Sequence, residues 1–495
     1  MPPTTPVAGK LTTGVAGLDD ILAGGLEAER VYLLEGTPGT GKTTLSLQFL
    51  LHGLAAGERA LYVTLSETET ELRAVATAHG WSLDGLDIFE LVDEAGLDLD
   101  AEQTVLHPAE LELGETTRGV MERVDATKPS RVVFDSLSEL RLLAQSPIRY
   151  RRQVLALKHF FTQRRCTVLL LDDRTEAGGD QQLHSIAHGV VTLEQLALDY
   201  GAERRRLRVV KMRGSRFRGG YHDFTIERGG LAVHPRLVAG EHHVVFADTK
   251  NSTGSGELDL LLGGGLVPGT SSLVIGPSGA GKTTMAISVV VAALRRGEHA
   301  AYFLFDEGRG TFLARSANLG MDLRPYLDSG QLALRQIDPA EMSPGEFVTH
   351  VRAAVEQRGA RVVVIDSLNA YLQSMPGEKF LRLQMHELLS YLNQRGVMTL
   401  MVLGQHGILG EFKSDVDLSY LSDTVIIIRY FEAEGELRKA VSVLKTRTSD
   451  HERTIREFSV DVGGVYVGAT LRGLHGVLSG RVAWRSDPPL EGEAG

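Results

Sequence analysis

Two glycine-rich segments carry residue types and a spacing that bind phosphate. Residues 36–43 read GTPGTGKT and residues 276–283 read GPSGAGKT, so both fit the pattern GxxxxGK[ST]. In such a loop the glycines let backbone N–H groups converge on a β-phosphate, and the N-terminus of the next helix adds positive potential. The lysine reaches the β- and γ-phosphates, and the threonine hydroxyl binds Mg²⁺. We therefore predict two ATP-binding loops, formed by Gly36, Thr37, Pro38, Gly39, Thr40, Gly41, Lys42, Thr43 and Thr44, and by Gly276, Pro277, Ser278, Gly279, Ala280, Gly281, Lys282, Thr283 and Thr284.

Acidic residues that could hold the metal follow an apolar run in each half of the chain. Asp135 ends RVVFD and Asp366 ends VVVID, and a serine follows each of them. An Asp in this place can bind Mg²⁺ through water or together with the loop threonine, Thr43 or Thr283. A helix N-cap or a strand-end turn is the competing interpretation. The paired context favours two magnesium sites.

A second group of acids could orient the nucleophile that attacks ATP. Glu67 follows Ser66 just after an apolar run, and Asp306 and Glu307 follow the corresponding run in the second half. Ligands of open α/β sheets bind at the carboxyl ends of strands, where such a carboxylate could activate water or a hydroxyl. The competing interpretation is a solvated acid that favours a helix dipole. The sequence does not decide which of the two adjacent acids acts.

Cations near the end of each half could complete the sites. Lys211 and Arg213 follow one β-like run, and Lys445 and Arg447 follow another. At a subunit edge they could reach the γ-phosphate of a neighbouring subunit and stabilise charge in the transition state. An ordinary charged strand end is the alternative.

The chain is an internal duplication. Residues 14–44 and 254–284 align without a gap, and roughly half of the aligned residues are identical. RVVFDS at 131–136 and HDFTIERGGLAV at 222–233 recur as VVVIDS at 362–367 and REFSVDVGGVYV at 456–467. We predict two homologous domains, 1–240 and 248–480, with a polar linker inside 234–255 and a short tail at 481–495.

The fold class follows from the order of apolar and amphipathic segments. Short apolar runs are expected to be buried strands at 31–35, 60–65, 132–134 and 167–171, and helix-like stretches lie between them at 43–56, 67–79 and 150–164. The second half repeats the runs at 272–275, 300–305, 362–365 and 398–403. This alternation predicts an α/β fold in each half, with a mostly parallel sheet covered by helices on both faces.

Composition excludes several classes of protein. Of the 495 residues 43% are hydrophobic and 23% are charged, which is typical of a folded globular chain. The net charge of −11 makes nucleic acid an unexpected partner, although residues 203–208 form a basic run. The single cysteine, Cys166, allows neither an intramolecular disulfide nor a cysteine zinc cluster, and the histidines form no ligand set. No secretory signal or membrane-spanning run is recognised, so we expect a cytoplasmic location.

The combined motifs resemble the KaiC family of ATPases over about residues 10–480. Both halves carry G.[PS]G.GKTT, a DS pair and a K.R pair. The resemblance implies tandem RecA-like domains and a hexamer with ATP between neighbouring subunits. It also implies slow ATP hydrolysis in the first ring, and autokinase with reverse phosphatase activity in the second. Signalling or circadian-clock regulation and partner proteins for it are further implications.

Residue by residue, the resemblance places the family's two adjacent glutamates on Ser66 and Glu67, and on Asp306 and Glu307. Its trans-acting cations fall on Lys211, Arg213, Lys445 and Arg447. Its phosphorylated Ser-Thr pair falls on Ser419 and Tyr420, and a nearby threonine falls on Ser414. Ser419 and Ser414 are therefore the predicted phosphoacceptors.

Two other functions stay open at this stage. RecA-like rings also move DNA, which predicts an ATPase stimulated by single-stranded DNA. Alternatively, ATP could hold an assembly together and mark its state for a partner without any kinase activity.

Overall fold

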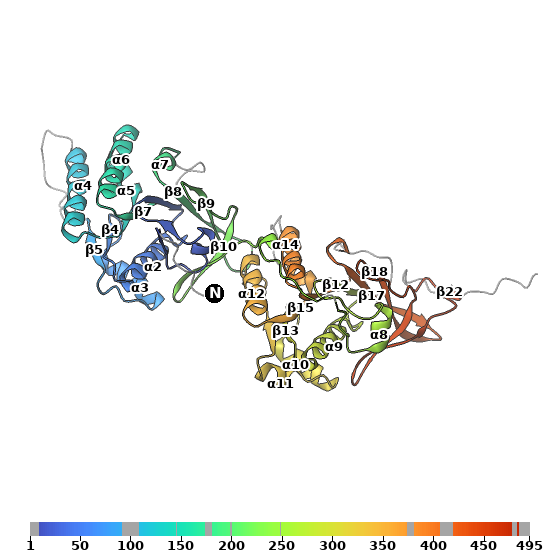
Figure 1. The fold of residues 1–495 in the computed structure, drawn as a ribbon. Helices are drawn as coiled ribbons and strands as arrows, with labels where there is room; N and C mark the ends of the chain where they lie inside the picture. The colour runs from blue at the N-terminus through green and yellow to red at the C-terminus, as the bar shows by residue number, and fades with distance from the viewer. Residues whose placement is uncertain are drawn as a thin grey trace, which may run out of the picture. The chain divides into compact units, whose positions relative to one another are not determined.

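The computed structural model describes residues 9–91, 108–144, 146–173, 181–198, 200–247, 249–373, 381–405, 419–477 and 483–484. The chain divides into two compact units, Met1–Arg236 and Leu237–Gly495. Each unit contains its own large sheet, with helices on both of its faces (Figure 1).

The sheet of the first unit has nine strands in the order β11-β10-β9-β8-β3-β7-β6-β4-β5. The strands from β8 to β5 are parallel, and β9 to β11 are antiparallel. Their bounds are β3 Val31–Gly36, β4 Ala60–Thr64, β5 Asp87–Glu90, β6 Arg131–Asp135, β7 Thr167–Asp173, β8 Gly189–Leu196, β9 Arg204–Met212, β10 His222–Glu227 and β11 Gly230–His234. A separate short pair joins β1 Lys10–Leu11 to β2 Leu26–Glu27.

Helices cover both faces of this sheet, which explains why its central strands are apolar without interruption. On β3, Tyr32 and Leu34 point into one core, and Val31 and Leu33 point into the other. The first core packs against α1 Leu18–Ile21, α2 Lys42–Ala55 and α3 Glu69–His79. The second packs against α4 Pro108–Thr127, α5 Leu137–Ala144, α6 Pro147–Gln163 and α7 Gln181–Ile186.

The second unit repeats this topology in the order β14-β13-β15-β16-β12-β17-β18-β19-β20. Its parallel strands are β14 Leu332–Gln336, β13 His299–Leu304, β15 Ala360–Asp366, β16 Met398–Gly404, β12 Ser271–Gly276 and β17 Thr424–Ala433. The antiparallel strands are β18 Glu436–Thr446, β19 Arg456–Asp461 and β20 Gly464–Thr470. A short pair joins β21 Leu474–His475 to β22 Ala483–Trp484.

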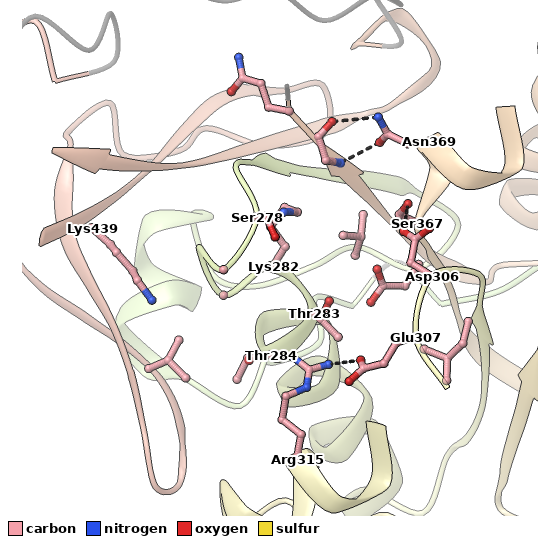
Figure 2. Close-up of a pocket in the computed structure, with 18 residues that line it drawn as sticks. Ser278, Lys282, Thr283, Thr284, Asp306, Glu307, Arg315, Ser367, Asn369 and Lys439 are labelled. Atoms are coloured by element: carbon pink, nitrogen blue, oxygen red, sulfur yellow. Dashed lines mark hydrogen bonds and ion pairs between the residues drawn. The ribbon is translucent and has the colours of Figure 1, made fainter. Parts of the chain in front are cut away.

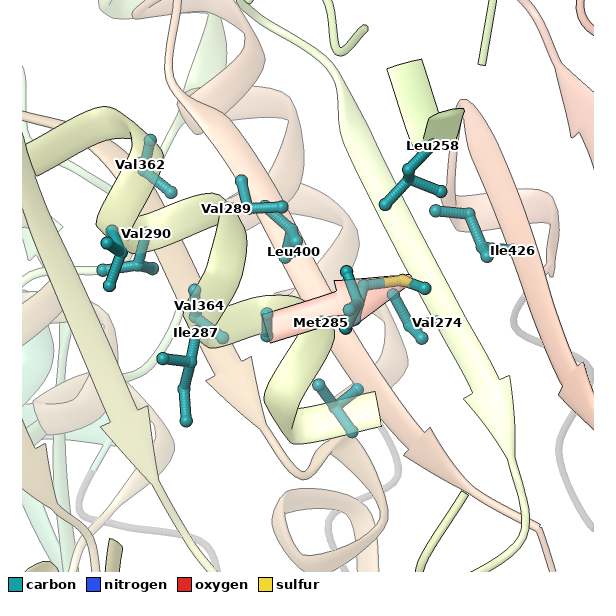
Figure 3. Packing of buried hydrophobic residues seen from close by; sticks show 14 of the residues in the cluster. Leu258, Val274, Met285, Ile287, Val289, Val290, Val362, Val364, Leu400 and Ile426 are labelled. Atoms are coloured by element: carbon teal, nitrogen blue, oxygen red, sulfur yellow. The ribbon is translucent and has the colours of Figure 1, made fainter. Parts of the chain in front are cut away.

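The helices of the second unit also form two layers. One core packs against α8 Gly256–Leu261, α9 Lys282–Arg295, α10 Arg309–Asn318 and α11 Arg324–Asp328. Figure 3 shows part of it, where Met285 and Val289 of α9 lie over Val274 of β12 and Leu400 of β16. The other core packs against α12 Pro344–Glu356, α13 Leu368–Gln373 and α14 Leu381–Gln394. Two 3₁₀ turns, η2 Ala239–Glu241 and η3 Ser419–Leu421, complete the unit.

These findings confirm the predicted fold class of two tandem α/β units with mostly parallel sheets. Residues of the expected linker contact the second unit. Leu237 and Ala239 are buried in the core of the second unit, and the Val244 amide donates to the carbonyl of Gln394 at 3.1 Å. No helix in the described ranges is long and apolar enough to cross a membrane.

The close approach of Gly17 to the backbone of Val233 can be tested by substitution. Its φ is +82°, and a Cβ there would lie 2.0 Å from the carbonyl oxygen of Val233. Gly57 has a similar φ of +80° but has no atom near its Cβ position within 4 Å. Gly57→Ala should lower the free energy of unfolding by about 1–2 kcal/mol through backbone strain alone. Gly17→Ala should add roughly 1–3 kcal/mol of overpacking. Urea unfolding of the full chain measures both; equal losses would contradict the close approach at Gly17.

Candidate nucleotide-binding sites

Each glycine-rich loop joins a buried central strand to a helix. Gly36 ends β3 and Gly276 ends β12, while Lys42 and Lys282 begin α2 and α9. A Cβ on Gly36 would lie 2.7 Å from the carbonyl oxygen of Leu193 on the adjacent strand, which explains the need for glycine there. Gly41 and Gly281 have φ of +96° and +105°, a conformation that glycine adopts without strain. The structure thus gives both predicted loops the strand-loop-helix setting that phosphate binding requires.

In the second unit a cavity of about 570 Å³ opens beside the loop. The loop contributes Ser278, Gly279, Gly281, Lys282, Thr283 and Thr284, and the strand ends contribute Asp306, Glu307, Asp366, Ser367, Gly404 and Gln405. Figure 2 shows Lys282, Thr283 and Asp306 around this space. Burial lowers the pKa of Lys282, whose ammonium donates to the carbonyl of Pro277 at 2.8 Å. Residues predicted from three separate segments therefore meet at one cavity.

The three acids of this cavity have different partners. Asp366 accepts a hydrogen bond from the Tyr302 hydroxyl at 2.7 Å; burial raises its pKa, and the hydrogen bonds of Tyr302 and Thr283 oppose that shift. Ser367 donates to Asp306, and Arg315 donates to Glu307 at 2.6 Å (Figure 2). Arg315 therefore offsets the charge of Glu307, whereas the partner of Asp306 is the neutral hydroxyl of Ser367.

The first unit repeats the frame with different charges. Lys42 donates to the carbonyl of Gly36 at 2.8 Å and forms an ion pair with Asp173 at 2.7 Å. The Tyr62 hydroxyl donates to Asp135 at 2.6 Å, as Tyr302 does to Asp366. Burial, followed by the negative charge of Asp135, raises the pKa of Glu67.

The two halves differ at Ser66, where the first half lacks an acid that the second half has. The strand registers make it the equivalent of Asp306, because β4 pairs with β6 as β13 pairs with β15. Ser136 is the equivalent of Ser367, and among the described residues its hydroxyl is buried with no hydrogen-bond partner. The first site therefore lacks the serine-held carboxylate of the second.

The oxygen atoms beside each loop fit a magnesium ion. Mg²⁺ is commonly held by one or two protein oxygens together with phosphates and water. Thr43 and Asp135 offer a hydroxyl and a carboxylate, and Thr283 and Asp366 offer the same pair in the second unit, where a hydrogen bond joins them. Burial raises the pKa of Asp135, and the Oε2 atom of Glu67 is buried without a partner in the described chain. A divalent cation would offset the negative charge gathered there.

The predicted trans-acting cations lie away from the loops of their own units. Lys211 pairs with Val190 near the start of β8, and Lys445 pairs with Val425 near the start of β17. Those strands are parallel to β3 and β12, whose carboxyl ends carry the loops. The two lysines thus lie near the amino ends of the parallel strands, and the loops lie at the carboxyl ends. Neither lysine therefore reaches the nucleotide loop of its own unit.

Backbone carbonyls hold these cations in place. Lys211 donates to His184, and Arg213 donates to Ser185 at 2.9 Å. Lys445 donates to Ser422 at 2.8 Å, and Arg447 donates to Tyr420 at 3.2 Å. The cations of the second unit are therefore tied to the segment that follows Ser419.

Of the predicted phosphoacceptors, Ser419 begins η3, and its side chain is outside the described part of the structure. Ser414 lies outside the described residues. The carbonyl of the next residue, Tyr420, anchors Arg447, and the Tyr420 side chain is exposed.

Sequence reasoning missed several residues of these sites. Tyr62 and Tyr302 lie within apolar runs, where an aromatic residue reads as core. Asp173 is the last residue of β7, and an acid at the carboxyl end of a predicted strand was the signal that could have found it. Arg315 belongs to no motif; it lies on α10, and the start of this helix after Glu307 brings its guanidinium to that carboxylate.

Arginines of the basic run in the first unit pair with acids and with an aromatic ring. Arg205 pairs with Glu203 at 3.2 Å, Arg206 pairs with Glu194 at 2.8 Å, and Arg206 also stacks over Tyr221. These contacts offset part of the positive charge of the run.

Comparison with known proteins identifies the family. A model of one family, described as the KaiC ATPase, matches residues 11–238 and again residues 251–472. The chain belongs to the KaiC family of ATPases. A relative in Synechocystis sp., named circadian clock protein KaiC3, is 28% identical over 97% of this chain and 96% of its own length. The circadian clock oscillator protein KaiC of Synechococcus elongatus is 27% identical over 95% of this chain and 91% of its own. Membership in this ATPase family gives ATP binding to the chain.

Glu67 and Glu307 are equivalent acids of the two KaiC-like halves, and we expect their substitution by glutamine to change stability differently. The pKa of Glu67 is raised in the folded state, so its ionised form disfavours folding once the pH exceeds its ordinary value of 4.5. Without nucleotide and Mg²⁺, Glu67→Gln should therefore raise the melting temperature at pH 7, and the gain should shrink as the pH falls toward 4.5. Differential scanning fluorimetry across this range measures it.

Glu307→Gln is the matched control, because Arg315 pairs with Glu307. Its melting temperature should stay the same or fall. A stabilisation by both substitutions would show that the contrast between the two sites is wrong.

Proposed function

We propose that this KaiC-family ATPase forms a ring, hydrolyses ATP in its first half and transfers phosphate from ATP to its own Ser419 in the second. Reverse dephosphorylation belongs to the same proposal. The observation that carries it is the arrangement around η3. Lys445 and Arg447 bind the carbonyls of Ser422 and Tyr420, at the edge of the sheet opposite the loop. The segment that contains Ser419 and the two cations can thus face the nucleotide of a neighbouring subunit together.

In the second half the chain's residues take separate roles. Lys282 binds the phosphates, and Thr283 and Asp366 would hold Mg²⁺, which when bound neutralises charge on the phosphate oxygens. Asp306, held by Ser367, accepts the proton of the Ser419 hydroxyl from the neighbouring subunit. The serine oxygen then bonds to the γ-phosphorus as the bond to ADP breaks. Lys445 and Arg447 of that neighbour stabilise the charge of the transition state.

In the first half water takes the place of serine. Glu67 is the acid that orients it, because burial raises the pKa of Glu67 toward the range in which a general base works. Thr43 and Asp135 would hold Mg²⁺, and Lys211 and Arg213 would serve the neighbour's nucleotide. Nothing stands in the place of the first acid except Ser66, which is consistent with slow hydrolysis.

The assembly and its setting are further parts of the proposal. Sites completed by a neighbour require an oligomer, and we propose a hexamer in the cytoplasm. The printed names of the relatives refer to circadian clocks. We accordingly propose a signalling or clock-related regulator with protein partners. The net charge of −11 and the paired arginines of β9 argue against a DNA motor.

Transfer between subunits can be tested by mixing two variants. Lys282→Ala should remove the nucleotide from the second half but leave Ser419 as an acceptor, and Ser419→Ala should do the reverse. Either variant alone should gain no phosphate on residues 411–424 with Mg·ATP. Mixed rings, with the Lys282→Ala chain isotopically labelled, should carry phosphate on the labelled chain. Intact-mass spectrometry and peptide mapping give the readout.

The control for this mixture adds Ser414→Ala to the labelled Lys282→Ala chain, which separates the two predicted acceptors because that chain then keeps only Ser419. Phosphate on Lys282→Ala chains alone would defeat the assignment. ATP-dependent assembly without any phosphate in the wild-type protein would favour an assembly switch that has no kinase activity.

A further inference from the structure

Lys42 forms an ion pair that has no counterpart among the described residues of the second half. Its ammonium lies 2.7 Å from Oδ1 of Asp173, and its side chain is only 9% exposed. Asp173 ends β7 and pairs in register with Gly36, the first residue of the loop. On β16 the residue in the same register with Gly276 is Gly404. At this register position, only the first half therefore carries a carboxylate.

The two sites have equal numbers of the acids named above, but these acids lie at the ends of different strands. The second site has Asp306, Glu307 and Asp366 around its cavity. In the first site Ser66 replaces the acid after β4, while Asp173 adds one after β7. Because β7 is adjacent to β3 whereas β6 and β7 separate β4 from β3, this change moves a negative charge to the strand next to the loop.

Neighbouring side chains orient Asp173 toward Lys42. Its amide donates to the Ser138 hydroxyl at 3.0 Å, and that hydroxyl donates to Asp172 at 3.3 Å. Arg141 fixes Asp172 through a hydrogen bond of 2.9 Å on the other face of the strand. Since successive residues of a strand point to opposite faces, anchoring Asp172 turns Asp173 toward Lys42.

This geometry sets a competition for one ammonium group. The lysine of such a loop binds the β- and γ-phosphates, so the γ-phosphate of ATP must displace Asp173 and then lie near its negative charge. ADP brings less negative charge to the same place. We propose that Asp173 determines nucleotide preference in the first half, where it weakens binding of ATP relative to ADP. The inference rests on nucleotide binding at this loop, which the proposed function includes.

The test compares the ratio of the Kd for ATP to the Kd for ADP, both with Mg²⁺. In a Lys282→Ala chain, where only the first half binds, Asp173→Gly should lower this ratio about tenfold or more, because a like charge near the γ-phosphate is removed. Asp173→Asn should act in the same direction. Isothermal titration calorimetry measures the Kd of each nucleotide for the Lys282→Ala parent and for both Asp173 variants.

The reciprocal change is structurally possible in the second half. A Cβ on Gly404 would meet only the Asn369 side chain, at an ordinary contact distance of 3.6 Å. In a Lys42→Ala chain, Gly404→Asp should raise the ratio about tenfold by the same repulsion. This variant keeps the proposal testable if substitution of Asp173 disturbs folding.

The outcomes separate this inference from the proposed function. An unchanged ratio with ADP still bound would overturn the role of Asp173 and leave the nucleotide site intact. Slower hydrolysis at an unchanged ratio would also overturn it, and would make Asp173 a catalytic acid. Failure of the Lys282→Ala chain to bind either nucleotide would count against the first-half site itself.

Discussion

The structure of each half depends on the junction where a central buried strand passes through a glycine loop into a helix. Backbone N–H groups must converge there, so no side chain can fill the space between loop and sheet. The carbonyl of Leu193 lies so close to Gly36, and that of Ile428 so close to Gly276, that only glycine fits. The helices α2 and α9 then begin at the lysine. The parallel strands around this junction all end at the same edge, where acids from distant segments meet.

Duplication kept this frame and changed the charges that it holds. Both units have the same strand order, and Tyr62 and Tyr302 hold Asp135 and Asp366 in the same way. Beside that shared pair the halves differ. The second unit places a serine-held Asp306 at the cavity, and the first unit places Asp173 against its lysine. A common fold can thus support two chemistries that differ in a few carboxylates.

The edge opposite the loops carries the other half of each proposed site. Lys211, Arg213, Lys445 and Arg447 all donate to backbone carbonyls just before the first antiparallel pairing of the sheet. A carbonyl orients a cation without removing its charge, although Arg447 also lies 3.8 Å from the carboxylate of Asp423. These contacts fix the direction of the cations whose role at a neighbouring subunit is proposed above.

The sequence by itself determined the duplication, the α/β class and the two loops, because glycine spacing and uninterrupted apolar runs depend only on local geometry and burial. It also placed Asp135, Asp366 and the K.R pairs, since each lies next to a readable strand. The tertiary structure decided which acid faces which partner. Glu307 is held by Arg315 from a helix, and Lys42 by Asp173 from another strand. The Lys42–Asp173 pair joins distant segments of the chain, and its charges interact strongly because folding buries the lysine side chain.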